Sequence, residues 1–487
     1  MAGNTNLTAS FAIMIASSAV TTLAAYEPAT AHSPRPLVLK GGTVIRPAFE
    51  DIEDGVVVTQ DNQIVCVGGR PDCEIPANSE IRDMRGKYIL PGLVDAHVHL
   101  SFTGWLDTRP DSVDLSDAYP YDETVAALRS EPGRWHRSYL CSGVTAVFDL
   151  GGAEWTVTGP QATDTQRSDR VHVVSAGMLL TPLKGANAPY TSGTLAEEPV
   201  FLPFETDDDV RAGIERLKEI GAGAIKVWFL AIPEDRRAEM EKRLVLTGAL
   251  AEQIGLPLVV HATDLRDAKA ALRAGASVLA HSVTDAPVDR EFLDLLVERD
   301  ATYIPTLLVI ENWRKALASA KFGTPLQVDD ANRCVDKDAL GRIEEPQILT
   351  RFLARRSPDS ILNALVAEGR TQAIVKQNLV SIRDAGGRIA LGSDAGNPLT
   401  LHGPGVLREL EAMQAAGMAP SEVIEAATSG GAHAMRQGST IGSLEAGKIA
   451  DLIVLEKDPR TDVRNFESLA FVMRNGVLRS QSELQVR

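Results

Sequence analysis

Short apolar runs at both ends of the chain are separated by turn residues, a pattern typical of β-hairpins. Near the N-terminus, LVLKGGTVI is followed by GVVVTQ and QIVCVG, which flank Asp-Asn. Near the C-terminus, FVMR and VLRS are joined by Asn475-Gly476, and this dipeptide favours a type I′ turn because both positions need positive φ. We therefore predict that residues 37–90 and 440–487 together form one small β domain.

The middle of the chain alternates apolar runs with amphipathic segments such as DDVRAGIERLKEIGAG. The apolar runs lie at residues 88–100, 145–150, 170–177, 224–229, 257–262, 278–282, 302–310 and 388–396. Runs that are continuously apolar are typical of parallel strands, which are buried on both faces. The pattern predicts an α/β fold: a TIM-like (β/α)8 barrel over residues 91–439, with a helical insertion at about 311–387. An open doubly wound sheet is the alternative.

The chain is acidic, with 49 Lys and Arg residues against 65 Asp and Glu residues and a formal net charge of −16. Binding of nucleic-acid phosphates needs clustered cations, and the chain has no long run of Lys or Arg, so we expect no nucleic-acid partner. Of the 487 residues, 44% are hydrophobic and 23% are charged, which is close to the average of globular proteins and excludes a disordered chain.

The N-terminal segment has the features of a secretory signal peptide. Residues 11–25 form an uncharged apolar run, and a small-x-small triplet that ends at Ala31 follows. We expect residues 1–31 to be removed and the protein to be periplasmic or secreted, with no membrane span after processing. Because no Lys or Arg precedes Arg35, an apolar N-terminal helix or a disordered leader is the alternative.

The chain has four cysteines, and these allow three full pairings. Cys66 and Cys73 are close enough in sequence for a local bridge if the compartment is oxidising. The alternative is that these two residues, Cys141 and Cys334 all remain small thiols. No Cys-x-x-Cys occurs, so we expect neither a cysteine zinc site nor thioredoxin-like chemistry.

Histidines and one aspartate recur where the predicted strands end. His97 and His99 are two residues apart, so on a strand both imidazoles point to the same side, as a shared metal ion requires. His261 lies in PLVVHA, His281 in VLAHS and Asp394 in LGSDAG, and the carboxyl ends of barrel strands carry the active site. His-x-His alone is as typical of an ordinary half-buried strand, but the combination predicts a metal centre. Imidazole and carboxylate suit zinc, without excluding manganese, iron or nickel.

Lys226 lies inside the apolar run AIKVWF, where an unpaired ammonium group is unfavourable. Burial lowers the pKa of a lysine, and a neutral amine reacts with CO2 to form a carbamate. A carbamate has two oxygens that can bridge two metal ions, as a carboxylate does. The alternative is a lysine that extends out of the strand or pairs with a nearby aspartate.

The motifs PGLVDAHVHL, AIKVW, VVHAT, LAHS and LGSDAG occur in this order and precede GSLEAGKIADLIVLEKDP. Together they resemble the metal-dependent amidohydrolase superfamily over about residues 37–480. Within it, HATDLRDAKAALRAGASVLAHS and GNPLTLHG resemble the prolidase-like and Xaa-Arg dipeptidase-like members. The resemblance implies a (β/α)8 barrel with a composite β-sandwich, and hydrolysis of a carbon–nitrogen bond.

The resemblance also implies that six side chains hold two divalent metal ions, with zinc the favoured ion: His97, His99, Lys226, His261, His281 and Asp394. The first two histidines bind the more buried ion, the other two bind the more exposed ion, and the carboxylated lysine bridges them. Asp394 binds the buried ion and is the general base. It takes the proton of a water that both ions share and delivers it to the leaving group of an amide, ester or lactone.

The substrate is expected to be a small molecule such as an amide, a dipeptide or an N-acyl amino acid, and the protein a homo-oligomer. His402 lies just past the predicted base and is expected to bind substrate or stabilise developing charge; a loop histidine that caps a helix is the alternative. Trp228 and Phe229 either line an apolar pocket or fill the core. Related peptidases often carry Gly-Gly-His after strand three, and LLTPLKGANAPY lacks that histidine, which counts against a peptide substrate.

Two other functions fit parts of the sequence. A mononuclear deaminase of the same superfamily uses a glutamate three residues after the histidine of strand five, where this chain has Asp264. Such deaminases also lack the strand-four lysine, and Asp264 suits the N-cap of a helix over LRDAKAALRAGA. A non-catalytic exported binding protein is the other alternative.

Overall fold

The computed structural model describes residues 35–486, except 48, 109–114, 116, 132, 160–165, 183–198, 231 and 346–357. The expected signal peptide over residues 1–31 and most of the segment LLTPLKGANAPY therefore lie outside the described residues. Among the described helices, none is long and apolar enough to cross a membrane.

Eight parallel strands form a barrel, which confirms the predicted α/β fold. They are β6 (Leu93–Val98), β7 (Val144–Asp149), β8 (His172–Ser175), β11 (Ile225–Trp228), β12 (Leu258–His261), β13 (Val278–Ala280), β14 (Thr302–Ile304) and β15 (Arg388–Ile389). Two backbone hydrogen bonds close the gaps between the two sheets. Gly223 donates to the Ser175 carbonyl at 2.7 Å, and Ala96 donates to the Leu391 carbonyl at 2.9 Å.

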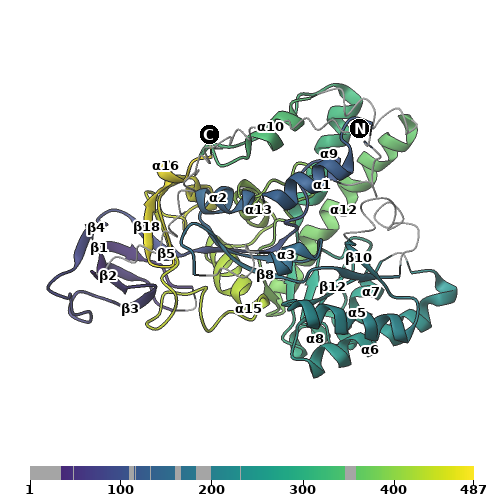
Figure 1. Cartoon of the computed structure of the whole chain (residues 1–487), viewed down its shortest axis with the longest axis horizontal. Coiled ribbons are helices and arrows are strands. Elements are labelled where there is room, and N and C mark those ends of the chain that lie inside the picture. The colour runs from purple at the N-terminus through teal and green to yellow at the C-terminus, as the bar shows by residue number, and fades with distance from the viewer. Residues whose placement is uncertain are drawn as a thin grey trace, which may run out of the picture. The chain divides into compact units, whose positions relative to one another are not determined.

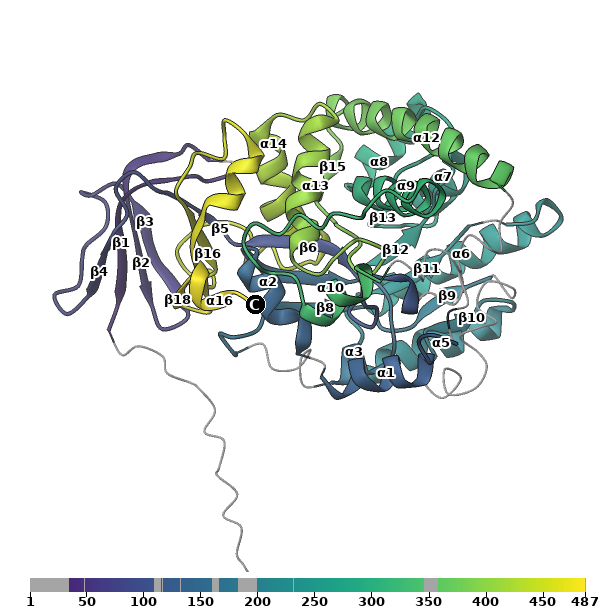
Figure 2. The ribbon, with the colours of Figure 1, turned by 90° about the horizontal axis from the view of Figure 1, so that it is seen from above.

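A short additional pair of strands, β9 (Leu179–Thr181) and β10 (Phe201–Pro203), extends the sheet beside β11. The helices that follow the strands lie outside them, as Figures 1 and 2 show. They include α1 (Tyr121–Ser130), α2 (Arg134–Cys141), α3 (Trp155–Thr158), α5 (Asp207–Ile220), α6 (Arg237–Gln253), α7 (Leu265–Arg273), α8 (Arg290–Glu298), α13 (Pro404–Ala415), α14 (Pro420–Glu425) and α15 (Gly431–Ala434).

Local sequence explains where these helices begin. Thr206 and Asp209 form a reciprocal capping box at the start of α5. The Asp264 carboxylate accepts the Asp267 amide at 2.8 Å and caps α7, so the interpretation of Asp264 as a helix N-cap is confirmed. Because this carboxylate serves the helix, it is a poor substitute for a deaminase glutamate.

Strands from both chain ends form one sheet, in the order β18-β17-β16-β5-β1-β2-β3, with β4 on β1. The strands are β1 (Leu37–Val44), β2 (Ile52–Gln60), β3 (Gln63–Gly68), β4 (Glu80–Asp83), β5 (Tyr88–Pro91), β16 (Leu452–Leu455), β17 (Leu469–Arg474) and β18 (Val477–Ser480). Figures 1 and 2 show the purple N-terminal strands next to the yellow C-terminal ones. Asn475 and Gly476 have φ of 54° and 79°, as the predicted hairpin turn requires.

Three predicted strand ranges are wrong. Residues 388–396 are strand only over Arg388–Ile389. Residues 88–100 do not form a single strand, because the chain leaves the β-sandwich domain after β5 and enters the barrel at β6. Residues 302–310 are strand only to Ile304, and α9 (Leu307–Phe322) begins three residues later. An apolar run of this length fits either state by pattern alone, and here Pro305 ends the strand.

The predicted insertion is helical where it is described. It contains most of α9, α10 (Lys337–Ile343) and α12 (Pro358–Asp384). Leu317 of α9 and Ile343 of α10 share a small apolar cluster with Trp105 and Leu106, which follow the first barrel strand. The insertion therefore packs against the segment that follows the first pair of histidines.

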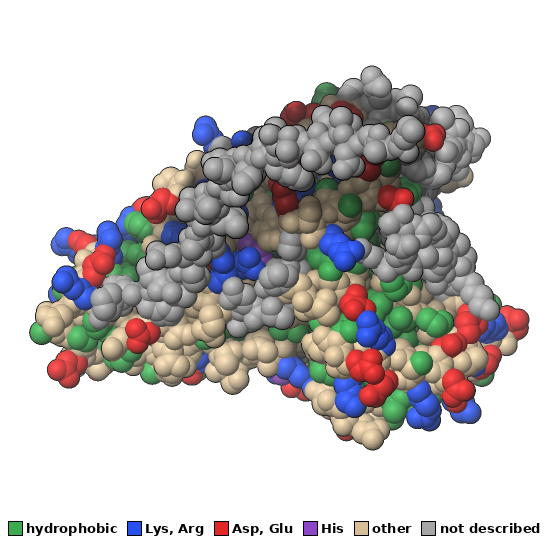
Figure 3. Space-filling view, viewed as in Figure 1, with side chains coloured by type: hydrophobic (Ala, Val, Ile, Leu, Met, Phe, Trp, Pro, Cys, Tyr) green, Lys and Arg blue, Asp and Glu red, His purple; other side chains and the backbone are tan. Residues whose placement is uncertain are grey.

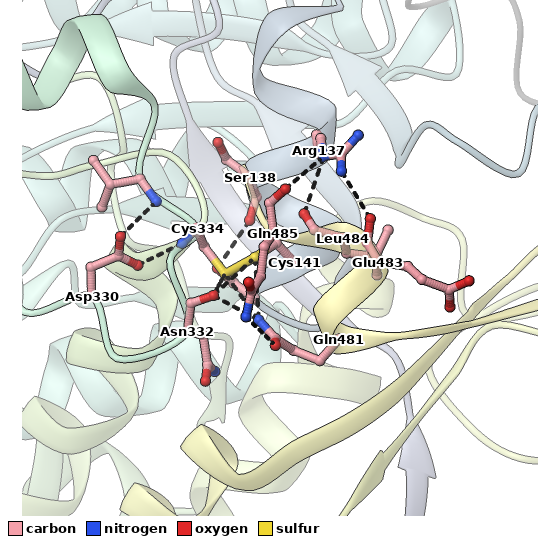
Figure 4. Close-up of a disulfide and its surroundings, with 12 residues drawn as sticks. Arg137, Ser138, Cys141, Asp330, Asn332, Cys334, Gln481, Glu483, Leu484 and Gln485 are labelled. Atoms are coloured by element: carbon pink, nitrogen blue, oxygen red, sulfur yellow. Dashed lines mark hydrogen bonds between the residues drawn. A yellow bond between two sulfur atoms is a disulfide. The ribbon is translucent and has the colours of Figure 1, made fainter. Parts of the chain in front are cut away.

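All four cysteines form disulfides. The suggested Cys66–Cys73 bridge is present, and the other two cysteines form the second bridge, Cys141–Cys334. The second bridge joins the end of α2 to the insertion (Figure 4). Beside it, Gln481 of α16 (Gln481–Leu484) donates a hydrogen bond to the Asn332 carbonyl at 2.7 Å.

We expect the long-range bridge to contribute much more stability than the local one. The bridged residues are 7 and 193 positions apart, and loop-closure entropy then predicts about 2 and about 5 kcal/mol respectively. Cys141→Ser/Cys334→Ser should therefore lower the free energy of unfolding more than Cys66→Ser/Cys73→Ser in denaturant titrations. Equal losses in the two double variants would contradict this prediction.

Charged side chains are interspersed on the described part of the face in Figure 3, where red and blue alternate around α5, α6 and α8. Several of them pair, such as Lys269 with Glu291 at 2.9 Å and Arg266 with Glu234 at 2.9 Å. Opposite charges on this part of the surface are therefore paired with one another.

Candidate metal and active site

A cavity of about 260 Å³ lies at the carboxyl ends of the barrel strands. Five of the six predicted metal ligands line it: His99, Lys226, His261, His281 and Asp394. The sixth, His97, is completely buried beside them. The structure thus brings together all six side chains that the sequence singled out as metal ligands.

Three of these side chains form a compact group. One ligand atom each from His97, His281 and Asp394 lies within 4.8 Å of the others. His99 adjoins this group, since its Nε2 lies 3.0 Å from Asp394 Oδ1, against 3.5 Å for His97 Nε2. His261 completes the row, with its ring 4.1 Å from the ring of His281 between centroids.

The buried polar atoms of this group fit a metal ion. Both ring nitrogens of His97 and the Nζ of Lys226 are buried and have no hydrogen-bond partner. Such atoms are costly to bury unless something coordinates them. The group's donors are imidazole nitrogen and carboxylate oxygen, which suit zinc and other first-row divalent ions.

Backbone contacts fix the positions of the first two histidines. His99 Nδ1 lies 2.6 Å from the Gly151 carbonyl and must donate to it, so the lone pair of Nε2 faces Asp394. A histidine that donates its second nitrogen to a carbonyl is typical of metal ligands. Gly392 lets the segment after β15 pack closely against His97, because a Cβ at position 392 would lie 2.6 Å from the Cβ of His97.

Burial shifts the protonation of two of these groups. It lowers the pKa of Lys226 to about 7, against the opposing charge of Asp394. Burial, together with the charge of Lys226, also holds the pKa of His97 well below its ordinary value. His97 is therefore neutral, the form that binds a metal, and a substantial fraction of Lys226 is the neutral amine at neutral pH.

A second buried carboxylate supports Asp394. Asp95, two residues before His97, accepts hydrogen bonds from the Ser393 amide at 2.8 Å and from its hydroxyl at 2.5 Å. Burial raises the pKa of Asp95 to about 7, and its hydrogen bonds from Ser393 oppose that shift. This contact fixes the residue that immediately precedes Asp394.

The backbone is strained at the site. His281, Thr306 and Asp394 have φ of 75°, 45° and 59° in the left-handed region, which non-glycine residues rarely adopt. Each such residue costs about 1–3 kcal/mol and persists only where its surroundings hold it. Two of these residues, His281 and Asp394, are candidate ligands. The surrounding structure therefore holds their side chains in place although the local backbone conformation is unfavourable.

Aromatic and aliphatic side chains form the wall of the cavity. Trp228 lies parallel to Phe201 with ring centroids 5.2 Å apart, and its edge meets His261. Phe229, the next residue, is completely buried and is not among the lining residues, because successive side chains of a strand face opposite ways. Of the two alternatives in the sequence, Trp228 lines the pocket and Phe229 fills the core.

His402 is not among the described residues that line the cavity, so its contact with substrate stays a prediction. Its Nε2 donates to the Phe102 carbonyl at 2.8 Å, and its Nδ1 therefore accepts from the Tyr139 hydroxyl at 2.7 Å. Its ring also stacks on Trp135. Burial lowers the pKa of His402 to about 3, so the ring is neutral and supports the wall of the site.

Sequence reasoning missed two groups that contact the candidate ligands. The Gly151 carbonyl orients His99, and the Thr306 hydroxyl lies 2.9 Å from Nδ1 of His281. A backbone carbonyl carries no sequence signal. Thr306 lies inside the apolar run 302–310, which the pattern predicts as one strand, so nothing in the sequence marks its hydroxyl.

A parallel barrel with histidines and an aspartate grouped at its strand ends defines a metal-dependent hydrolase. Residues 88–479 match the amidohydrolase family. The chain belongs to this family and is a hydrolase that acts on carbon–nitrogen bonds.

Individual relatives cover most of the chain. It is 25% identical over 435 residues to the imidazolonepropionase of Solibacter usitatus, which is 85% of this chain and 87% of that protein. It is 25% identical over 457 residues to the ochratoxinase of Aspergillus niger, with coverage of 88% and 83%. A crystal structure of a Xaa-Pro dipeptidase with bound methionine has a TM-score of 0.67 at 20% identity, covering 91% of this chain and 100% of that chain. That likeness supports the fold.

Proposed function

We propose that the protein hydrolyses amide bonds of small molecules at a centre of two divalent metal ions, with zinc the favoured ion. The six candidate ligands named above would hold the ions. The observation that carries this proposal is the pair of unpartnered, buried ring nitrogens of His97 beside His281 and Asp394 at a cavity. A neutral imidazole is the commonest metal ligand in proteins, so a metal ion suits this buried histidine.

Asp394 is the proposed general base. Bound metal ions would supply Lewis acidity, lowering the pKa of a water and polarising the substrate carbonyl. The Asp394 carboxylate accepts the proton of the attacking water and then passes it to the leaving nitrogen. Asp95 and Ser393 hold the preceding residue, and the amide of Asp394 donates to the His97 carbonyl at 2.7 Å, so the base keeps its position.

Lys226 is proposed to carry the carbamate. Its neutral amine attacks CO2, the new N–C bond forms, and one proton leaves to solvent. The product is a carbamate anion, which replaces the amine that has no hydrogen-bond partner. The burial of this lysine, its unpartnered Nζ and its lowered pKa support this step.

The cavity wall supports a substrate with an apolar group next to the scissile amide. Phe201, Trp228 and Trp313 line it, together with aliphatic residues. An aromatic or aliphatic N-acyl amino acid or dipeptide would bury its apolar part there. The names of two relatives, an ochratoxinase and a Xaa-Pro dipeptidase, agree with amide substrates of this size.

We also propose that the protein is exported. Both disulfides support an oxidising compartment, since reducing cytosol keeps thiols free. The apolar segment over residues 11–25 would direct export. Expression with a C-terminal tag, followed by fractionation and mass measurement of the mature N-terminus, tests both points; an uncleaved cytosolic protein would contradict them.

The function is tested with protein loaded with Zn²⁺ in bicarbonate buffer. We expect it to release amine from N-acyl amino acids or dipeptides, faster with phenylalanine or leucine than with glycine next to the bond. A chelator should abolish release, and added Zn²⁺ should restore it. Ammonia release from adenine or cytosine analogues would favour the deaminase instead, and ligand binding without turnover would favour a binding protein.

A further inference from the structure

Glu409 of α13 is a carboxylate buried behind the site. Its side chain is completely buried, and its two oxygens accept hydrogen bonds from the amides of Leu307 and Leu308, each at 2.8 Å. These amides are the first two of α9, and the first amides of a helix have no partner within the helix. Glu409 therefore fixes the start of α9 from a different helix.

The residue that precedes α9 is strained. Thr306 has φ of 45° and makes no side-chain hydrogen bond to its own helix. A β-branched residue in the left-handed region is a true outlier. Its conformation is held by what surrounds it, and the next two amides are both bound to Glu409.

The Thr306 hydroxyl is directed at a candidate metal ligand. It lies 2.9 Å from Nδ1 of His281. His281 itself has φ of 75°, and its amide donates to the Ile304 carbonyl at 2.9 Å. The end of β14 thus holds the backbone of His281, and Thr306 holds its ring. Glu409 holds the two residues that follow Thr306.

We propose that Glu409 is a positioning residue for the metal centre, which orients the His281 ring through the start of α9 and Thr306 without touching the ring. The inference rests on the proposed role of His281 as a metal ligand. It goes beyond the hydrolytic reaction, because it concerns which residues orient a metal ligand.

The test measures Zn²⁺ affinity by chelator competition in the absence of substrate. Glu409→Gln keeps one acceptor oxygen but turns an NH2 group toward the second amide. Thr306→Val removes the hydroxyl and keeps the shape of the side chain. We expect each change to weaken Zn²⁺ binding about 10- to 100-fold, as for other groups that orient a ligand, and to alter the visible absorption spectrum of the Co²⁺-loaded protein.

Two matched controls accompany these variants. Thr306→Ser keeps the hydroxyl, and Glu411→Gln changes a glutamate of the same helix that pairs with Arg408 at 2.8 Å near the surface. Both should keep the Zn²⁺ affinity of the unchanged protein. The double variant Glu409→Gln/Thr306→Val should bind Zn²⁺ about as weakly as the worse single variant, because both act through one contact.

A helix-stabilising role alone gives a different result. Glu409→Gln would then lower the unfolding midpoint of the metal-free protein but bind Zn²⁺ as tightly as Glu411→Gln, and the proposal would be wrong. If Glu409→Gln fails to fold, Thr306→Val against Thr306→Ser decides, and equal affinities overturn the proposal. Since no substrate is used, the result is independent of whether the protein hydrolyses amides.

Discussion

Lys226→Ala is expected to reduce the rate of hydrolysis by more than about 100-fold. Loss of a group that only orients a metal ligand already lowers metal affinity or activity by about 10- to 100-fold, and Lys226 is a proposed ligand itself. The bound metal should fall from about two ions per chain to about one. Lys226 is buried and its Nζ has no partner, so the substitution removes no structural hydrogen bond. Metal analysis and hydrolysis rates on the same preparation measure both effects.

Carboxylate rescue separates a carbamate from a simple amine. The alanine variant has room where the lysine side chain was, and acetate or propionate can supply the missing pair of oxygens there. We expect partial recovery of both activity and the second ion. Lys218→Ala is the matched control, because Lys218 is an exposed lysine on α5 that pairs with Glu215. Full activity of Lys226→Ala would exclude the carbamate.

The candidate metal ligands could be singled out because their positions follow from strand geometry, whereas their assignment to two ions rests on the family resemblance. The two-residue spacing of His97 and His99 and the strand-end positions of His261 and His281 need no knowledge of tertiary packing. Lys226 stood out because an amine inside an apolar strand is unfavourable. Strand alternation also explains why Trp228 lines the cavity while Phe229 fills the core, although the sequence alone left their roles open.

The sequence is least informative where long-range contacts decide the structure. His402 is held by Tyr139 and Trp135 of α2, more than 250 positions away in the chain, and no local pattern reports such contacts. The run 302–310 is half strand and half helix, because Pro305 ends the strand and a distant glutamate caps the helix that follows. Pairing of Cys141 with Cys334 depends in the same way on where the insertion folds back.

Glu409 did carry a signal that pattern analysis can use. It lies three residues after Val406 and four before Met413, on the face of α13 that faces the core, where an apolar residue is expected. A carboxylate at such a position must be paired. The pattern shows that Glu409 needs a partner, and only the fold shows that the partner is the start of α9.

Asp394→Asn is expected to abolish hydrolysis while leaving the fold intact. A general base contributes about 10²- to 10⁴-fold, and an amide cannot take its proton. Asp394 has φ of 59°, and asparagine tolerates this left-handed conformation well, so the backbone need not change. Hydrolysis rates and thermal unfolding of the variant test the two halves of this expectation.

Asp300→Asn is a control of the same chemistry and backbone conformation. Asp300 also has positive φ, at 48°, but it is exposed and pairs with Arg388 at 2.9 Å. It should keep full activity, and both variants should unfold near the temperature of the unchanged protein. Because Asp394 is also a proposed ligand, metal content must be measured beside activity. An inactive variant that retains both ions assigns Asp394 to proton transfer, loss of an ion assigns it first to binding, and retained turnover with both ions bound refutes its role as base.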